Sequence, residues 1–498
     1  LIIDGKEIRT GNTTDVIMPH EHGHVLAKCH QGGEKEIGMA IDAALKAHRQ
    51  WSDLTWTIRA SIMLKAADLI STKYRATINA STMLGQSKNI YQSEIDAVCE
   101  VIDFLKYNSY YAGKIYESQP KSAFNQLNRM EFRALEGFIF AVSPFNFTSI
   151  ASNLNMAPII MGNTTIWKPA PTAILSNYYL MKVYMEAGVP AGVINFLPGN
   201  GPQIGKQLMA SPDFAGFHFT GSNQTFNTLW KQVSENLTKY KSYPRVVGET
   251  GGKDYIFVHP SAKPDEVAAN TIRGAFEYQG QKCSAVSRMY VPTSLWPELK
   301  ELLVDMTNDI RMGEVTNVKN FMNAVIDEKA FDKITGYIED AKESADAEII
   351  AGGEYDKSEG YYIRPTLVQV KDPRFNTMQE EIFGPVLSIY VYPDEKLEDT
   401  IRLCDTTSPF GLTGAVFSKD RVAAARICDQ LRYSAGNFYI NDKPTGAIVG
   451  LQPFGGSRMS GTNDKAGGEF NLVRWVSPRT IKETFVPVSD YRYPYMKE

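Results

Sequence analysis

The chain has 498 residues, of which 43% are hydrophobic and 22% are charged, a composition typical of folded globular proteins. A net charge of −4, with no offsetting cluster of lysine and arginine, argues against a nucleic-acid partner. The sequence contains no unbroken apolar stretch of about 18 residues and predicts no membrane span. A chain of this length is expected to form at least two domains.

The cysteines are few and form no C-x-x-C pair; they are Cys29, Cys99, Cys283, Cys404 and Cys428. An odd, widely spaced set predicts free thiols in a reducing compartment and neither disulfides nor a zinc site. His20, His22 and His24 lie close together in sequence, but no cysteine pair or carboxylate cluster joins them. We therefore predict an irregular surface segment there and no metal site.

The first third of the chain has apolar residues at helical spacing, for example over 37–45 and 58–70, and is predicted to be helical. From residue 138 the pattern changes to short apolar runs that end in polar or glycine residues. These runs predict strands over 138–142, 164–167, 193–197, 217–219 and 245–247, with a helix over 176–187. Alternating strands and helices predict an α/β fold with a parallel sheet covered on both faces. Ligands of such sheets bind beyond the carboxyl ends of the strands.

A second α/β region is predicted from residue 254, with strand-like runs at 349–353 and 386–391. Residues 112–133 are polar and interrupted, and they are predicted to form a protruding hairpin. The tail after Arg474 is predicted to add a strand to a neighbouring chain. The two segments together predict a homodimer or a higher homo-oligomer.

Polar residues follow several of the predicted strands, and each can have a structural or a functional role. The Asn146 amide either caps the following helix or donates to an oxyanion. Lys168 is either a solvated charge or a ligand for ribose hydroxyls or phosphate. Gly221 and Ser222 precede a helix N-terminus that could receive a pyrophosphate. Glu249 either caps a glycine-rich turn or acts as a general base whose pKa is raised by burial.

Cys283 differs from the other cysteines because glycine and polar residues surround it, and it is the candidate nucleophile. A thiol, the Glu249 carboxylate and the Asn146 amide together indicate acyl-enzyme chemistry on a carbonyl. The nucleotide-binding positions at the strand ends indicate that the reaction is an oxidation.

The sequence closely resembles the aldehyde dehydrogenase superfamily in motifs that follow the family order along nearly the whole chain. These motifs are Pro144–Phe147, Trp167–Pro169, Phe219–Ser222, Glu249–Lys253, Gly280–Cys283, Glu380–Pro385 and Pro453–Gly456. Within the superfamily it most resembles the 1-pyrroline-5-carboxylate dehydrogenases, through Phe276–Tyr278, Asn437–Lys443, Ile448–Gly450 and Ser460–Lys465. The resemblance implies a Rossmann-type NAD-binding domain over 1–111 and 134–250 and a catalytic domain over 251–457. It also implies an oligomerisation hairpin and tail over 112–133 and 458–498.

The resemblance further implies that Cys283 attacks the aldehyde of L-glutamate γ-semialdehyde, the open form of 1-pyrroline-5-carboxylate, in the second step of proline degradation. Asn146 and the Cys283 N–H would hold the oxyanion, hydride would pass to NAD⁺, and water activated by Glu249 would hydrolyse the thioester to glutamate. The implied cofactor-binding residues are Ser143, Lys168, Gly221, Ser222, Glu381 and Phe383. The implied substrate-binding residues are Glu100, Phe147, Ser284, Gly446, Ala447 and Phe454, with Ser284, Gly446 and Ala447 receiving the α-carboxylate.

Two residues depart from the family pattern. Ala447 stands where a close relative has serine, so one hydroxyl contact is lost and the backbone N–H remains. Pro171 stands where many members carry a ribose-binding glutamate, so some use of NADP beside NAD is expected.

Three alternatives remain open at the level of the sequence. They are a dehydrogenase of another carboxylated aldehyde such as succinate semialdehyde, a non-catalytic relative like the lens crystallins, and a fragment of a bifunctional proline-oxidising enzyme. The expected compartment is the cytoplasm in a bacterium or the mitochondrial matrix in a eukaryote. Because the chain begins with Leu1, we expect that an N-terminal segment has been removed.

Overall fold

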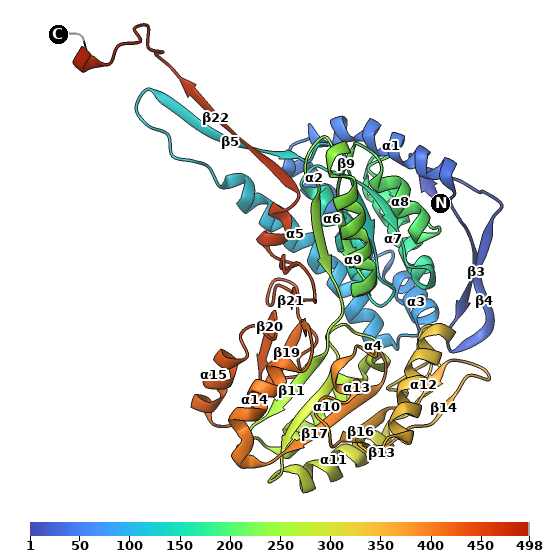
Figure 1. Cartoon of the computed structure of the whole chain (residues 1–498). Helices are drawn as coiled ribbons and strands as arrows, with labels where there is room; N and C mark the ends of the chain where they lie inside the picture. Colours follow the sequence, from blue (N-terminus) through green and yellow to red (C-terminus); the bar gives the residue numbers. More distant parts are fainter. Residues whose placement is uncertain (497–498) are drawn as a thin grey trace.

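The computed structural model describes residues 1–496, which form two α/β lobes, each built on a seven-stranded sheet, and a projecting arm (Figure 1). The predicted fold class is confirmed. None of the helices in residues 1–496 combines the length and apolar character needed to cross a bilayer.

The first lobe contains a sheet with the order β10-β9-β6-β7-β8-β1-β2. Its strands are β1 (Ile2–Ile3), β2 (Lys6–Glu7), β6 (Phe138–Val142), β7 (Thr164–Lys168), β8 (Ile194–Phe196), β9 (Phe214–Thr220) and β10 (Arg245–Glu249). The five strands from β6 to β10 are parallel, and β1 and β2 add an antiparallel edge. All five strands predicted from the apolar runs are present, and the predicted helix is α7 (Ile174–Ala187).

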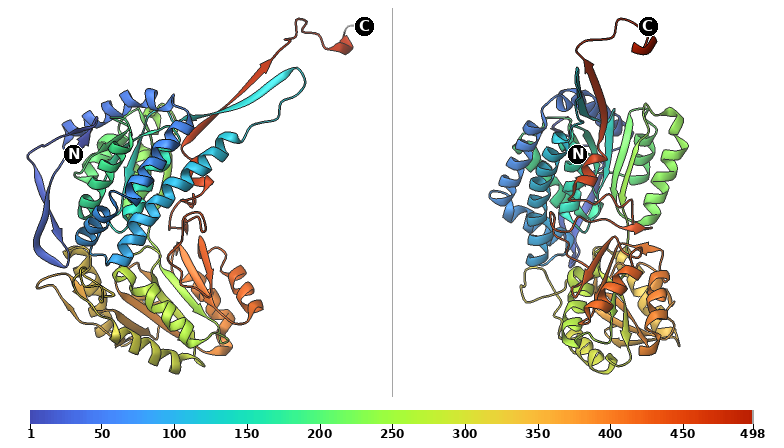
Figure 2. Two further views of the ribbon diagram at one scale, coloured as in Figure 1. Left: turned by 180° about the vertical axis from the view of Figure 1, so that it is seen from behind. Right: turned by 90° about the vertical axis from the view of Figure 1, so that its left-hand side faces the viewer.

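Alternate residues of these strands face two different cores, as the period of a strand requires. Phe138 and Phe140 pack against α1 (Glu34–Ser52), α8 (Gly201–Met209) and α9 (Asn223–Glu235). Ile139 and Ala141 pack on the other side, against α2 (Trp56–Ser71), α5 (Glu100–Glu117), α6 (Thr148–Ile160) and α7. The right-hand view of Figure 2 shows helices on both sides of this sheet.

The second lobe contains a sheet with the order β13-β16-β17-β12-β11-β19-β20. Its strands are β11 (Asp254–Val258), β12 (Val286–Pro292), β13 (Ala347–Ala351), β16 (Thr366–Val370), β17 (Val386–Tyr392), β19 (Thr413–Phe417) and β20 (Asn437–Ile440). Helices α10 (Pro264–Phe276) and α11 (Trp296–Asp309) cover one face. Helices α12 (Glu328–Glu343), α14 (Leu397–Thr406) and α15 (Arg421–Gln430) cover the other. Only β13 runs antiparallel to its neighbour.

The arm differs from the predicted hairpin over 112–133. Residues 112–117 continue α5, because Ala112 and Ile115 are buried in the core of the first lobe. The arm consists of β5 (Gln126–Ala134) paired antiparallel with β22 (Val476–Thr484), so the strand of the tail pairs with its own chain. Figures 1 and 2 show the arm extending from the first lobe into solvent.

The N-terminal region also differs from the prediction of helices alone. It begins with β1 and β2 and then a bulged antiparallel pair, β3 (Thr13–Met18) and β4 (Glu21–His30). His22 and His24 therefore lie on β4 instead of an irregular segment, because the pairing of β4 with β3 makes their backbone extended. Within residues 1–496, no group of three or more histidine, cysteine or acidic side chains could hold a metal ion.

The long helix that ends in α5 begins as α4 (Ile90–Ser93) and contains a π-helical stretch, Glu94–Cys99. The residues of α4, this stretch and α5 follow one another without a gap. The π-helical stretch lies against the cavity between the lobes and places Asp96 and Cys99 on its wall. Such π-helical stretches frequently occur at functional sites.

Candidate functional site

A cavity of about 360 Å³ lies where the two lobes meet. Cys283 and Glu249, the predicted nucleophile and base, both line it. All the predicted substrate-binding residues line the same cavity: Glu100, Phe147, Ser284, Gly446, Ala447 and Phe454. The structure thus brings together residues from five separate stretches of the sequence, around 100, 147, 249, 283 and 446–454.

An unusual turn at Tyr278–Gly280 precedes Cys283 and positions it on the cavity wall. Tyr278, Gln279 and Gly280 have φ values of 52°, 57° and 67°, so three consecutive residues are left-handed. This conformation is costly for residues other than glycine and occurs mainly where surrounding contacts enforce it. The Tyr278 hydroxyl donates to Gln86 O at 2.9 Å, and the Gln279 amide donates to Ser87 O at 3.0 Å and to Ala324 O at 2.8 Å. These buried bonds hold the turn that precedes the nucleophile.

The Cys283 thiol is neutral at rest. Burial raises its pKa, and the neighbouring carboxylates of Asp254, Glu249 and Glu381 raise it further. Since the thiolate is the reactive form, this cysteine requires a base that removes its proton during attack.

Glu249 ends β10, and its carboxylate points into the cavity, where it accepts a hydrogen bond from the Gly456 N–H at 3.1 Å. Burial raises the pKa of this carboxyl well above its usual value, and the charge of Asp464 adds to the rise. The Gly456 hydrogen bond and Lys465 act in the opposite direction but are outweighed. A carboxyl with a raised pKa is suited to accept a proton near neutral pH.

Asn146 lies in the turn between β6 and α6 and is 3% exposed. Its side-chain amide donates to the Gln281 backbone oxygen at 3.0 Å, which ties it to the loop that carries Cys283. An asparagine amide has two N–H donors, so one remains for another acceptor. Its tie to the Cys283 loop is compatible with the predicted role as a donor to the oxygen of a substrate attacked by the Cys283 sulfur.

The predicted cofactor residues gather at the carboxyl ends of the first sheet. Lys168 ends β7 beside Gly201, and burial lowers its pKa to about 8. Gly221 follows β9, and Ser222 caps α9 by accepting a hydrogen bond from the Thr225 N–H at 3.2 Å. The Ser143 hydroxyl accepts from the Trp167 indole at 2.9 Å inside the protein. A buried ammonium beside a helix N-terminus fits the polyol and phosphate groups of a dinucleotide.

The second lobe supplies the two remaining cofactor residues. Glu381 accepts a hydrogen bond from the Gly252 N–H at 3.0 Å, and burial raises its pKa. Phe383 has a φ of 60°, and its ring meets the Phe145 ring edge-on at 5.8 Å between centroids. Phe145 belongs to the first lobe, so this contact joins the two lobes beside the proposed nicotinamide position. The residues present fit a dinucleotide bound across both lobes.

The substrate end of the cavity combines an acid and an aromatic wall. Glu100 accepts a hydrogen bond from Ser149 at 2.7 Å, and burial raises its pKa to about 8. Phe147 lies beneath the Lys88 ammonium, which is 4.3 Å from the ring centroid. Phe454 is fixed by two backbone hydrogen bonds with Ala466, at 2.9 and 2.8 Å.

The anion-binding end is built from a loop of the second lobe. The hydroxyls of Ser284 and Thr445 share a hydrogen bond of 2.7 Å. Gly446 has a φ of 91°, a left-handed conformation that glycine adopts without strain. Ala447 follows it on the cavity wall.

Sequence reasoning missed a buried charge cluster beside this cavity. Lys88 pairs with Asp96 at 2.7 Å, and Lys282 approaches Asp96 at 3.7 Å and Glu277 at 3.5 Å. Arg273 completes the cluster by pairing with Glu277 at 3.0 Å. The Arg273–Glu277 pair has i,i+4 spacing, which sequence alone could have indicated. The contact of Asp96 with Lys282 joins distant segments, and no local pattern predicts it.

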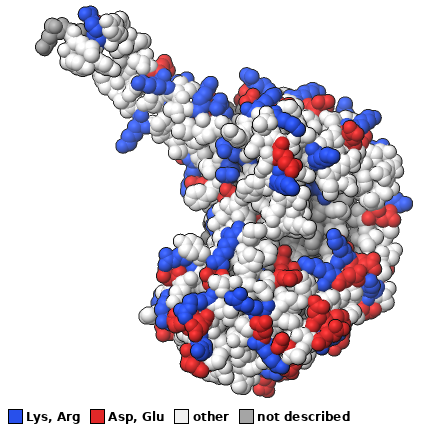
Figure 3. Space-filling view, in the orientation of Figure 1, with Lys and Arg blue, Asp and Glu red and all other residues white. Residues whose placement is uncertain are grey.

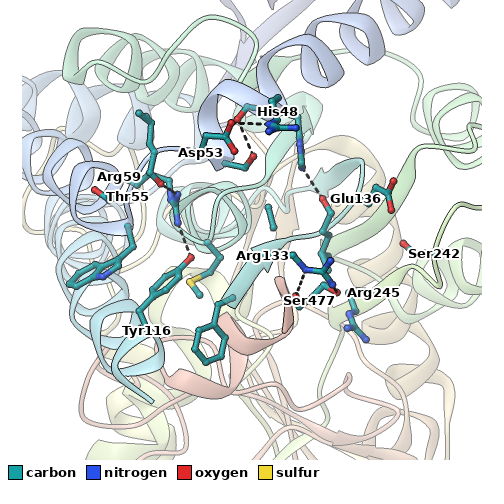
Figure 4. Close-up of a pocket in the computed structure, with 18 of the residues that line it drawn as sticks. His48, Asp53, Thr55, Arg59, Tyr116, Arg133, Glu136, Ser242, Arg245 and Ser477 are labelled. Atoms are coloured by element: carbon teal, nitrogen blue, oxygen red, sulfur yellow. Dashed lines mark hydrogen bonds and ion pairs between the residues drawn. The ribbon is translucent and has the colours of Figure 1, made fainter. Parts of the chain in front are cut away.

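A larger cavity, of about 920 Å³, lies at the base of the arm and contains none of the predicted site residues (Figure 4). Several of its polar groups are engaged within the protein. His48 is hydrogen-bonded to Leu135 O at 2.8 Å, and Arg59 donates to the Tyr116 hydroxyl at 2.8 Å. Size therefore does not identify the functional site. The smaller cavity is identified by the thiol and carboxylate on its wall, with the Asn146 amide bonded to the loop that carries the thiol.

Comparisons with known proteins show the family of the chain. The sequence matches the aldehyde dehydrogenase family over residues 7–481. It is 52% identical to the mitochondrial delta-1-pyrroline-5-carboxylate dehydrogenase of Dictyostelium discoideum, over 99% of this chain and 89% of that protein. It is 47% identical to the human mitochondrial protein of that name, over 100% and 88%.

Solved structures of proteins with this name have the same fold. The Delta-pyrroline-5-carboxylate dehydrogenase of Mycobacterium tuberculosis bound with NAD has a TM-score of 0.96 and 48% identity, covering 100% of this chain and 92% of that one. The NAD-bound 1-pyrroline-5-carboxylate dehydrogenase from Thermus has a TM-score of 0.92 and 30% identity, covering 97% and 92%. The chain belongs to the aldehyde dehydrogenase family.

Proposed function

We propose that the protein oxidises L-glutamate γ-semialdehyde, the open form of 1-pyrroline-5-carboxylate, to L-glutamate with NAD⁺. The observation that carries the proposal is one cavity that joins Cys283 and Glu249 to an anion-binding loop and the Glu100 carboxyl. Relatives at 47–52% identity over almost the full chain carry the name of this activity, and two similar structures bind NAD. The reaction belongs to proline degradation.

In the proposed mechanism, Glu249 takes the Cys283 proton through a water molecule as the sulfur attacks the aldehyde carbon. The Asn146 amide and the Cys283 backbone N–H stabilise the negative oxygen of the thiohemiacetal. Bound NAD⁺ supplies the acceptor for the hydride that leaves this carbon. Glu249 first passes the proton from Cys283 to solvent and then removes a proton from the water that attacks the thioester. The released Cys283 thiolate regains a proton, and glutamate leaves.

For the cofactor, we assign ribose and phosphate contacts to Lys168, Gly221 and Ser222, with Ser143 lining the same strand ends. Glu381 and Phe383 would hold the nicotinamide ribose and ring. Since Pro171 cannot hydrogen-bond to the adenosine ribose through its side chain, we expect preference for NAD with some use of NADP.

For the substrate, we assign the methylene chain to the space between Phe147 and Phe454. The α-carboxylate would meet Ser284, Gly446 and Ala447, and the amino group would approach Glu100. The Glu100 contact favours this substrate over succinate semialdehyde, which lacks an amino group. The intact set of Cys283, Glu249 and Asn146 disfavours a crystallin-like role without catalysis.

The direct test is product analysis with the purified protein, 1-pyrroline-5-carboxylate and NAD⁺. We expect NADH and glutamate to appear in a one-to-one ratio, because each thioester hydrolysed follows one hydride transfer. No NADH above a no-enzyme control would contradict the proposed function.

We also propose the predicted domain division, with 1–111 and 134–250 binding NAD and 251–457 carrying the catalytic cysteine. Of the predicted hairpin and tail segments, 112–133 and 458–498, the paired strands β5 and β22 and the described residues after β22 would serve assembly, since residues 112–117 belong to α5. For the compartment, we propose the mitochondrial matrix if the source is a eukaryote, as in the names of the Dictyostelium and human relatives, and the cytoplasm if it is a bacterium.

We further propose that the arm forms a homodimer or a higher oligomer. The residues after β22 expose apolar side chains that a solvated monomer would not favour: Phe485, Val486, Val488, Tyr491, Tyr493 and Tyr495. On the face of the lobes that Figure 3 shows, acidic and basic side chains are interspersed.

Truncation after Thr484 is expected to weaken this assembly by removing the apolar segment, with Cys283 chemistry retained in the monomer. Sedimentation velocity at micromolar concentration measures the change. A full-length chain that sediments as a monomer would contradict the proposed assembly.

A further inference from the structure

The cavity that holds Cys283 and Glu249 has a polar stretch of wall with no role in the site described so far. Its members are Thr220 and His218 on β9 and Asn471 on α16 (Glu469–Val473). Thr220 is 8% exposed, and His218 and Asn471 are each 3% exposed. The fold therefore buries three polar side chains on the wall of the cavity that contains the nucleophile and the base.

The pairing of β9 with β10 places two of these side chains beside Glu249. Thr220 is the register partner of Glu249, and His218 is the register partner of Val247. Neighbouring strands lie about 4.8 Å apart, and residues two apart on one strand point to the same face of the sheet. This face is the one covered by α6, since His218 Nδ1 is hydrogen-bonded to Leu154 O on that helix at 3.0 Å. The Thr220 hydroxyl therefore lies next to the base.

The polar wall has hydrogen-bonding capacity that residues 1–496 do not use. Because Leu154 O can only accept, His218 donates from Nδ1, and burial lowers its pKa to about 3. His218 Nε2 thus stays unprotonated and is an acceptor. The Asn471 side chain forms no hydrogen bond within the described chain, and its Oδ1 is fully buried. Buried polar groups that lack a protein partner usually bind ordered water.

The chemistry of the polar wall suits a water molecule. A buried water needs two to four polar partners. The wall offers an acceptor at His218 Nε2, an amide at Asn471 and a hydroxyl at Thr220, with the Glu249 carboxylate beside them. None of the three wall side chains is charged, so the wall favours a small neutral molecule over an ion. Thioester hydrolysis requires such a molecule next to its base.

We propose that Thr220, His218 and Asn471 hold the water that hydrolyses the thioester, and that they are positioning residues for this step. The inference rests on the proposed function and deepens it. The oxygen of this water bonds to the thioester carbon, one of its protons passes to Glu249, and the carbon–sulfur bond breaks. The acid product then loses a proton to solvent, and the Cys283 thiolate regains one.

The test uses Asn471→Leu and Thr220→Val, which remove hydrogen-bonding groups at nearly constant volume. Stopped-flow absorbance of the NADH burst gives the rate of hydride transfer from 1-pyrroline-5-carboxylate. Acid quenching followed by mass spectrometry of the intact protein gives the rate at which the thioester decays. We expect decay of the thioester to slow about 10-fold or more, because its water is no longer positioned. The burst rate is expected to stay within about twofold.

Asn177→Leu is the matched control, because Asn177 is a fully buried asparagine on α7 whose amide also lacks a hydrogen-bond partner within residues 1–496. It does not line the cavity, so both rates are expected to stay unchanged. Thioester decay at the unaltered rate in the two folded wall variants would overturn the proposal. Equal slowing of the burst and of the decay would also overturn it, and would leave only a role in packing.

A crystal structure of the unaltered enzyme tests the water site without any turnover. We expect a water about 2.7–3.2 Å from His218 Nε2 and from the Asn471 amide. A dry wall, at a resolution that shows other buried waters, would contradict the proposal. The proposed function fails on a different result, namely no oxidation of 1-pyrroline-5-carboxylate by the unaltered enzyme.

Discussion

Replacing Cys283 by alanine is expected to reduce NADH formation from 1-pyrroline-5-carboxylate by at least about 10⁴-fold. Without the sulfur no thiohemiacetal forms, and no other cysteine can replace it at the turn held by Tyr278 and Gln279. The Kd for NAD⁺, measured by calorimetry, is expected to change by less than about threefold, because the cofactor residues lie on other segments. Steady-state NADH absorbance gives the rate.

Cys99→Ala is the control, since Cys99 lines the same cavity on the π-helical stretch and has no assigned role. It is expected to retain nearly full activity. Turnover above a few per cent in Cys283→Ala, after exclusion of contaminating enzyme, would remove Cys283 from the role of nucleophile.

Glu249→Gln is expected to lower kcat about 10²- to 10⁴-fold, because an amide cannot take the proton of the attacking water. Solvent water can still take the Cys283 proton slowly, whereas thioester hydrolysis has lost its base, so the thioester would accumulate. The variant should therefore produce a slowed burst of NADH close to one per active site, followed by much slower turnover. Stopped-flow absorbance separates the two phases. A variant without a burst would show that Glu249 acts mainly before hydride transfer.

The pH dependence follows from the raised pKa of Glu249. As the pH rises through the pKa of Glu249, a larger fraction of the Glu249 side chains is ionised and can act as a base, so thioester hydrolysis accelerates. Asp464 contributes to the raised pKa, so Asp464→Asn should move the rise in rate to lower pH while the NADH burst is retained. An unchanged profile in this variant would argue that another group limits hydrolysis.

The fold was largely predictable from the sequence, for a physical reason. Strands of a parallel sheet are buried on both faces and appear as continuous apolar runs, so 138–142 and the four following strands were identified directly. Residues such as Lys168 and Glu249 end these strands, which explains why the sequence also predicted where they gather.

Features that depend on distant segments were not predictable in this way. The arm pairs β5 with β22, for example Ala134 with Val476. These residues are far apart in the chain, so no local sequence pattern indicates their pairing. The π-helical stretch at Glu94–Cys99 differs from an α-helix by one residue of register, which apolar spacing does not resolve. His218 and Asn471 belong to separate elements, and only the fold places both on the wall of the cavity that contains Glu249.

The ratio of kcat/KM for 1-pyrroline-5-carboxylate to that for succinate semialdehyde tests the central claim most directly. Both substrates carry a carboxylate, and only the glutamate semialdehyde presents an amino group to Glu100. The account predicts a ratio well above one, of about 10 or more, because one additional charged contact is made. A ratio below one would contradict the assignment of L-glutamate γ-semialdehyde as the substrate.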